Sequence, residues 1–105
     1  MTIRISHGWT TPENADAYER LLKIEIFPGI EAKGVAGYLG IELLRRNAGD
    51  EVEFVTVMRF RSMDDVRAFA GEDHEPAYVR TSGRKVLKRF EPASLHYEVR
   101  ETRRY

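Results

Sequence analysis

Polar and apolar residues alternate over residues 3–10, with ring-bearing or aliphatic side chains at odd positions and polar or small ones at even positions. This alternation predicts a first strand. Thr11-Pro12 is typical of a helix start, because threonine caps free amides and proline suits the first helical position. We expect this helix to end or kink at Phe27-Pro28-Gly29, since proline lacks the amide hydrogen and clashes with the preceding turn.

The middle of the chain predicts a β-hairpin followed by a second helix. Apolar positions over residues 38–46 and 51–60 flank a turn at residues 47–50. Ser62-Met63-Asp64-Asp65 has the form of a capping box, with aspartate in place of the usual glutamate. We expect the helix that begins there to end at Gly71.

The last third predicts weaker helical structure and one more strand. An acidic loop over residues 72–76 leads to a helical stretch that ends near Phe90, and residues 95–99 alternate as a strand. The element order is therefore β-α-β-β-α-β. This order predicts an α+β, ferredoxin-like fold with an antiparallel sheet, formed by residues 1–105 as one domain.

The predicted third strand is apolar on both faces. Phe54 and Met58 alternate with Val55 and Val57, although a sheet covered by helices on one side is usually apolar on that face only. A second copy of the chain is the economical cover for the other face. We therefore expect a homodimer formed through the sheet faces.

Composition narrows the classes of function. The 105 residues contain no cysteine, which excludes disulfides, thiol nucleophiles and cysteine-ligated metal sites. No apolar run is long enough for a membrane span, and the first residues lack the apolar stretch of a signal peptide, so we expect a cytoplasmic protein without a membrane partner. The basic cluster over residues 80–89 has helical spacing and is interpreted as a solvated helix face rather than a nucleic-acid surface.

Two segments resemble strands of a known family. In Gly37–Arg45 a glycine leads into an apolar run with an embedded glutamate, and Phe54–Ser62 joins a strand to a helix cap. Both segments, and the element order of nearly the whole chain, resemble the antibiotic biosynthesis monooxygenase superfamily. That group includes cofactor-free oxygenases of aromatic substrates, quinol monooxygenases and haem-degrading enzymes. The resemblance implies a dimeric α/β barrel with a pocket between the helices and the inner sheet face.

The chain departs from the residues that such relatives use. Quinol monooxygenase relatives usually carry tryptophan where Phe60 stands and histidine near the position of Phe69. Haem-degrading members use a helix tryptophan and a later histidine, and their first-strand asparagine falls about where His7 stands. The nearest later histidine here is His74. Since a fold does not determine an activity, the substrate stays open.

His7 and Trp9 are the first candidates for the pocket. They share a strand face with Ile3 and Ile5. An imidazole accepts a proton near neutral pH, and an indole stacks on a flat aromatic substrate. The alternative is a hydrogen-bonded histidine and a packed tryptophan in the core.

His74 is the second catalytic candidate, since it lies among Glu72, Asp73 and Glu75. These groups suit a divalent cation, or the imidazole suits haem iron, but the alternative is a solvated acidic loop. No metal-ligand spacing recurs, so no metal site is predicted. Four aromatic residues are expected to contact substrate in addition to Trp9: Tyr38, Phe54, Phe69 and Tyr78.

Three hypotheses follow. The leading one is a cofactor-independent monooxygenase that acts on a small aromatic or quinol substrate, with His7 as proton acceptor and an apolar cavity that holds the anion near dioxygen. The second is a haem-binding or haem-degrading protein with His74 or His7 as axial ligand. The third is a non-catalytic dimer that binds a small apolar ligand. None of them involves nucleic acid.

Overall fold

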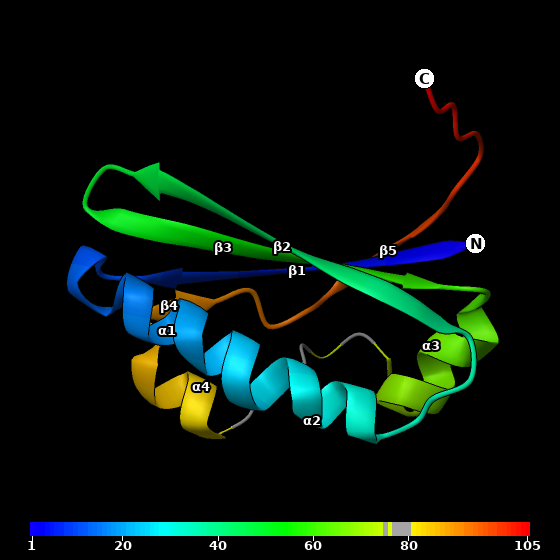
Figure 1. The fold of residues 1–105 in the computed structure, drawn as a ribbon, viewed down its shortest axis with the longest axis horizontal. Coiled ribbons are helices and arrows are strands. Elements are labelled where there is room, and N and C mark those ends of the chain that lie inside the picture. Colours follow the sequence, from blue (N-terminus) through cyan, green and yellow to red (C-terminus); the bar gives the residue numbers. More distant parts are fainter. Residues whose placement is uncertain (75, 77–80) are drawn as a thin grey trace.

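A computed structural model describes residues 1–74, 76 and 81–105 of the chain (Figure 1). Five strands form one antiparallel sheet in the order β2-β3-β1-β4, and β5 also pairs with β1. The strands are β1 (Thr2–Thr10), β2 (Tyr38–Ala48), β3 (Glu51–Phe60), β4 (Arg89–Phe90) and β5 (Leu95–Glu98). The predicted ferredoxin-like element order is confirmed, except that Arg89 and Phe90, expected at the end of a helical stretch, form the short strand β4.

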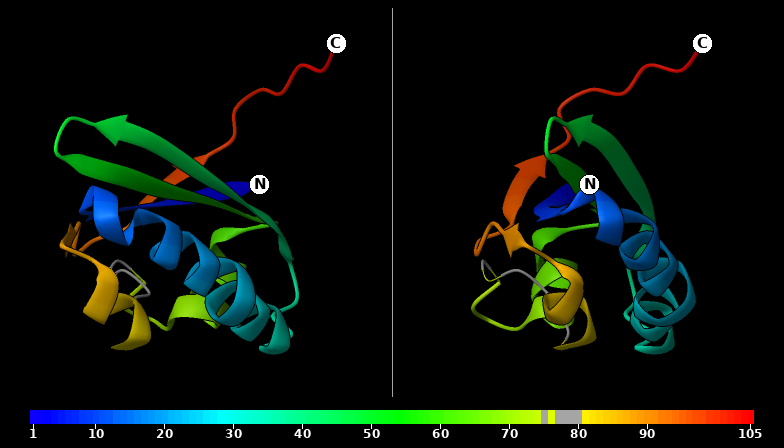
Figure 2. Two further views of the ribbon diagram at one scale, coloured as in Figure 1. Left: turned by 60° about the vertical axis from the view of Figure 1, so that its left-hand side comes forward. Right: turned by 90° about the vertical axis from the view of Figure 1, so that its left-hand side faces the viewer.

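The helices lie on one face of this sheet, as Figure 1 and both views of Figure 2 show. They are α1 (Ala15–Leu21), α2 (Phe27–Ala32), α3 (Met63–Ala70) and α4 (Thr81–Val86). No described segment covers the opposite face, which we call the outer face. Within the described residues, no helix has the length and apolar character needed to cross a membrane.

The first helical region differs from its prediction at both ends. Thr11 makes no side-chain cap, and a 3₁₀ turn over Pro12–Asn14 precedes α1. Pro28 does not end the helix, because a π-helical turn over Leu22–Ile26 comes before it. In this π-helical turn the amide of Phe27 donates to the carbonyl oxygen of Leu22, which is one residue further back than in an α-helix. Pro28 then falls in the first turn of α2, where a missing amide hydrogen costs nothing.

The hairpin and the start of α3 agree with their predictions. Strands β2 and β3 are joined by the tight turn Gly49-Asp50. The hydroxyl oxygen of Ser62 accepts from the amide of Asp65 at 3.4 Å and donates to its carboxylate at 3.1 Å. This reciprocal cap satisfies a free amide at the first turn of α3. The helix ends at Gly71, as expected.

The core lies between the helices and the facing side of β3. Phe60 and Val66 are fully buried, and the ring of Phe60 lies 5.6 Å from that of Tyr38 and 5.7 Å from that of Phe69. Strict alternation along β2 would place Tyr38 on the face opposite Ile41, but a register shift between Tyr38 and Gly40 turns Tyr38 toward the helices.

Candidate functional site

A cavity of about 60 Å³ lies between α1, α2 and the sheet. Its helix wall is mostly apolar and is formed by Tyr18, Leu22, Ile26, Phe27 and Ile30. Its floor comes from β1, β2 and β3 and includes Arg4, Ser6, Gly8, Ile41, Phe54, Thr56 and Met58. Gly83, Leu87 and Phe90 close one side. The cavity therefore combines an apolar wall with a floor that carries a cation and two hydroxyls.

The floor depends on which face of β1 points inward, and the prediction for this strand is wrong. Arg4 is 1% exposed and Thr10 is fully buried, whereas the odd-numbered residues of β1 are only half-buried. Register supports the same assignment, since Arg4 pairs with buried Met58 and Gly8 with buried Phe54. The polar and small residues of β1 therefore face the helices, and the apolar ones lie on the outer face.

Arg4 is the most buried charged side chain at the cavity. Its Nη1 donates to the carbonyl oxygen of His74, and its Nη2 donates to that of Pro76 at 2.9 Å. Its guanidinium carbon also lies 5.7 Å from the ring centre of Phe69. Burial lowers the pKa of Arg4, because desolvation disfavours the charged form, but a guanidinium stays protonated in proteins.

His96 of β5 contacts the same guanidinium. Its Nε2 lies 3.0 Å from Nη1 of Arg4, and since arginine only donates, Nε2 must accept and the ring must be neutral. Burial, together with the charges of Arg4 and His74, lowers the pKa of His96 from 6.5 to about 4. The ring of His74 lies edge-on at 4.9 Å. We call Arg4, His74 and His96 the arginine cluster.

Stability is expected to fall when the pH is lowered from about 6.5 toward 4. His96 has a lower pKa in the folded protein than in the unfolded chain, so the unfolded chain binds the proton first. The stabilisation that comes from neutral His96 is complete above its unfolded pKa of 6.5, and it is lost as the pH falls toward 4. It amounts to about 1–2 kcal/mol, less than the full shift because the ring is partly exposed.

Urea denaturation of wild type and His96→Gln across this pH range measures the effect. The amide oxygen of glutamine accepts from Arg4 but does not titrate, so the variant should have a flatter pH dependence. Equal slopes for the two proteins between about pH 6.5 and pH 5 would contradict this role of His96.

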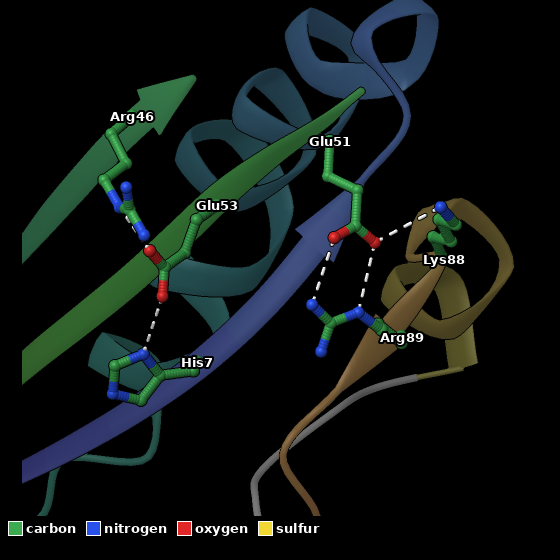
Figure 3. Close-up of polar contacts among 6 residues, drawn as sticks. All are labelled: His7, Arg46, Glu51, Glu53, Lys88 and Arg89. Atoms are coloured by element: carbon green, nitrogen blue, oxygen red, sulfur yellow. Dashed lines mark hydrogen bonds and ion pairs between the residues drawn. The ribbon is translucent and has the colours of Figure 1, made fainter. Parts of the chain in front are cut away.

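The outer face carries the other predicted histidine. Nδ1 of His7 lies 3.1 Å from a carboxylate oxygen of Glu53, whose second oxygen accepts from Arg46 at 2.6 Å (Figure 3). Arg46 first, and His7 second, hold the pKa of Glu53 below its usual range. The backbone of His7 runs between Ser6 and Gly8 and so borders the cavity, but its imidazole points to Glu53.

Trp9 belongs to the same face. Its ring lies 6.2 Å from that of His7, and the guanidinium of Arg89 lies 3.8 Å over the indole. Arg89 and Lys88 pair with Glu51 and lower the pKa of that carboxyl to about 2 (Figure 3). His7 and Trp9 were expected to line the cavity together; they lie together, but their side chains are on the other face of the sheet.

The remaining predicted residues divide between the cavity and the core. Phe54 is 2% exposed and lines the cavity, with its ring edge-on to that of Tyr18 at 5.0 Å. Phe69 lies against Arg4, and Tyr38 packs on Phe60 away from the cavity. Tyr78 falls outside the described residues. The catalytic and substrate-binding roles of all these residues stay predictions.

Metal and haem binding were the alternatives for His74. Among residues 1–74, 76 and 81–105, no three histidine, aspartate or glutamate side chains are grouped as metal ligands. The imidazole of His74 lies 3.4 Å from the carbonyl oxygen of Glu72.

Sequence reasoning missed Arg4 and the role of His96. It treated the apolar side of β1 as the inner side, which is the usual rule for a sheet with one covered face. The available signal was the third strand: since β3 is apolar on both faces, the apolar side of β1 does not by itself identify the inner face. His74 and Phe69, which were predicted, both contact Arg4.

Comparisons with known proteins find the same fold in solved structures. No family model and no curated protein sequence matches the chain. A candidate antibiotic biosynthesis monooxygenase from Bacillus cereus matches with a TM-score of 0.65 and 14% identity, over 99% of this chain and 97% of that one. Rv0793 from Mycobacterium tuberculosis matches with a TM-score of 0.60 and 20% identity, over 96% of each chain.

A third structure is a mutant of MhuD with two manganese protoporphyrin IX molecules bound per active site. It matches with a TM-score of 0.59 and 22% identity, over the full length of both chains. At these identities the likeness concerns the fold. The chain thus has the ferredoxin-like fold of antibiotic biosynthesis monooxygenase-like proteins, as the resemblance of its strands predicted.

Proposed function

We propose that this chain is a homodimeric, cofactor-independent monooxygenase that acts on a small aromatic or quinol substrate in the cavity beneath α1 and α2. The observation that carries this proposal is the cavity itself, which has an apolar helix wall, the aromatic residues Tyr18 and Phe54, and a polar floor. A cofactor-free oxygenase needs a site that excludes water and favours the substrate anion. The likeness to the candidate monooxygenase from Bacillus cereus supports the same activity.

Substrate entry requires a larger cavity than the present one. The volume of about 60 Å³ is below that of a cavity of roughly 150 Å³, a size that binds benzene. Leu87 is half-buried and lies over Gly8, where an added Cβ atom would meet its Cδ2 at 3.0 Å. An incoming ring has to displace Leu87, because this side chain lines the cavity and lies over Gly8 of its floor.

The homodimer forms through the outer face. Ile5, Val55 and Val57 are half-buried there although no described segment covers them. Charged pairs border these residues, including Arg59–Glu42 at 3.0 Å and Arg46–Glu53 at 2.6 Å. An apolar strip with paired charges around it is the composition that a face-to-face sheet contact requires.

The sequence predicted His7 as the proton acceptor, but we propose His74, the second catalytic candidate, for this role. Its main chain binds Arg4 beside the cavity and its ring contacts His96, whereas the imidazole of His7 binds Glu53 on the outer face. His74→Ala is expected to lower kcat/KM by about 100-fold, the smaller end of what a general base contributes, while His7→Ala retains turnover.

Oxygen consumption with a panel of quinols and phenols measures both variants against wild type. Each variant is first compared with wild type by circular dichroism and by its oligomeric state, so that misfolding is separated from lost chemistry. If the folded His7→Ala protein loses turnover while His74→Ala keeps it, the proton acceptor is His7. If no compound is consumed by wild type, a non-catalytic ligand-binding dimer replaces the oxygenase.

A further inference from the structure

Arg4 differs from the other arginines of the sheet in its partners. Arg45, Arg46, Arg59 and Arg89 each pair with a carboxylate, and all of them are partly open to solvent. Arg4 is 1% exposed, and its hydrogen-bond partners in the described part of the chain are neutral. A buried charge is usually compensated by an opposite charge, so a buried cation held only by neutral groups suggests a missing anion.

The hydrogen bonds of Arg4 show which donors remain. Nη1 meets the carbonyl oxygen of His74 and Nε2 of His96, and Nη2 donates to the carbonyl oxygen of Pro76. Nε is buried and has no hydrogen-bond partner among the described residues. Since a guanidinium carries five N–H donors, the Nε–H group and one N–H group of Nη2 are left. These two donors match the two oxygens of a carboxylate, or a single charged oxygen.

The surroundings of Arg4 suit an aromatic ligand. Arg4 lines the same cavity as Ser6 and Thr56, whose hydroxyls lie further along the floor, and the opposite wall is apolar with the rings of Tyr18 and Phe54. A flat ring packs against such a wall while its charged oxygen meets the cation. In a site closed to water this charge pair is much stronger than in solution.

We propose that Arg4 binds the charged oxygen of a small aromatic anion, a carboxylate or a phenolate, and that the cavity selects this anion over the neutral molecule of the same shape. The proposal rests on the cavity of the proposed function and names the class of molecule that enters it. His96 is a positioning residue, because its neutral ring holds Nη1 of Arg4 in place.

The test compares benzoate with benzamide, which has nearly the same shape but no charge. Both are titrated into wild-type protein at neutral pH and followed by the amide and arginine Nε–H resonances in NMR spectra. Benzoate is expected to bind at least tenfold more tightly, with shifts at the Nε–H resonance of Arg4 and at residues of the cavity. Ionised 4-nitrophenol serves as a second probe, and the tighter of the two anions identifies the oxygen that the site prefers.

Two variants of Arg4 test whether its positive charge is the cause of the preference for the anion. Arg4→Met removes the charge and is expected to bind the two probes equally, while Arg4→Lys keeps the charge and is expected to retain part of the preference. Arg20→Met, on the exposed side of α1, is the matched control and should behave as wild type. Equal binding of benzoate and benzamide to wild type overturns the proposal, and so does a preference that survives in folded Arg4→Met.

Binding and turnover are separate measurements. Selective benzoate binding without oxygen consumption from any quinol supports this inference and rejects the oxygenase. Oxygen consumption without any preference for the anion overturns this inference and leaves the oxygenase.

Discussion

Val57→Asp is expected to separate the dimer into monomers. Val57 lies at the middle of the outer face, paired with Ile5 on β1 and with Glu42 on β2. In a face-to-face dimer the new carboxylate is taken out of water without a partner, at a cost of about 3 kcal/mol or more. The dissociation constant should therefore rise by roughly 100-fold or more. Sedimentation equilibrium of both proteins over a range of concentrations measures it.

A matched control is available in the helical layer. Ile24 is 69% exposed on the helix side of the sheet, so Ile24→Asp makes the same kind of change far from the outer face. This variant should keep the mass of wild type in solution. A monomeric wild type, or a Val57→Asp protein that remains dimeric at low concentration, would exclude the sheet-face dimer.

Phe60→Ala is expected to destabilise the fold strongly. Phe60 is fully buried and packs between the rings of Tyr38 and Phe69. Its replacement removes apolar contacts and leaves a cavity, at a cost of about 3–5 kcal/mol. A domain of this size is stable by only about 5–15 kcal/mol in total. Urea denaturation followed by circular dichroism should therefore show a large decrease in the midpoint.

Ile24→Ala is the comparison for this effect. Ile24 is also apolar but mostly exposed, so its truncation to alanine should change the free energy of unfolding by about 0.5 kcal/mol or less. If Phe60→Ala costs no more than Ile24→Ala, the aromatic packing around Phe60 is not what stabilises the sheet against α3.

Local sequence determined most elements of the fold. Alternation marked the strands, and the Ser62–Asp65 cap and Gly71 marked the ends of α3, because these signals depend on residues a few positions apart. Local signals were less reliable at Pro28. There a π-helical turn moved the proline into a first turn, which depends on how the whole helix packs on the sheet.

The candidate site was only partly predictable. Phe54 was expected at the cavity and lines it, and two other predicted site residues, His74 and Phe69, contact Arg4. Arg4 itself could not be recognised locally. Its partners are residues 74, 76 and 96, and only the pairing of β1 with β5 and the path of the chain after α3 bring them together.

The sequence by itself determined the element order. It also showed that the sheet carries apolar residues on both faces, so that both faces need to be covered. Only the tertiary structure decided which side of β1 faces the helices, because a strand pattern of period two shows that its faces differ but not which one is covered. Packing on α1 and α2 placed the polar side inward, and with it Arg4. Because neighbouring side chains of a strand point in opposite directions, an inward Arg4 places His7 and Trp9 on the outer face.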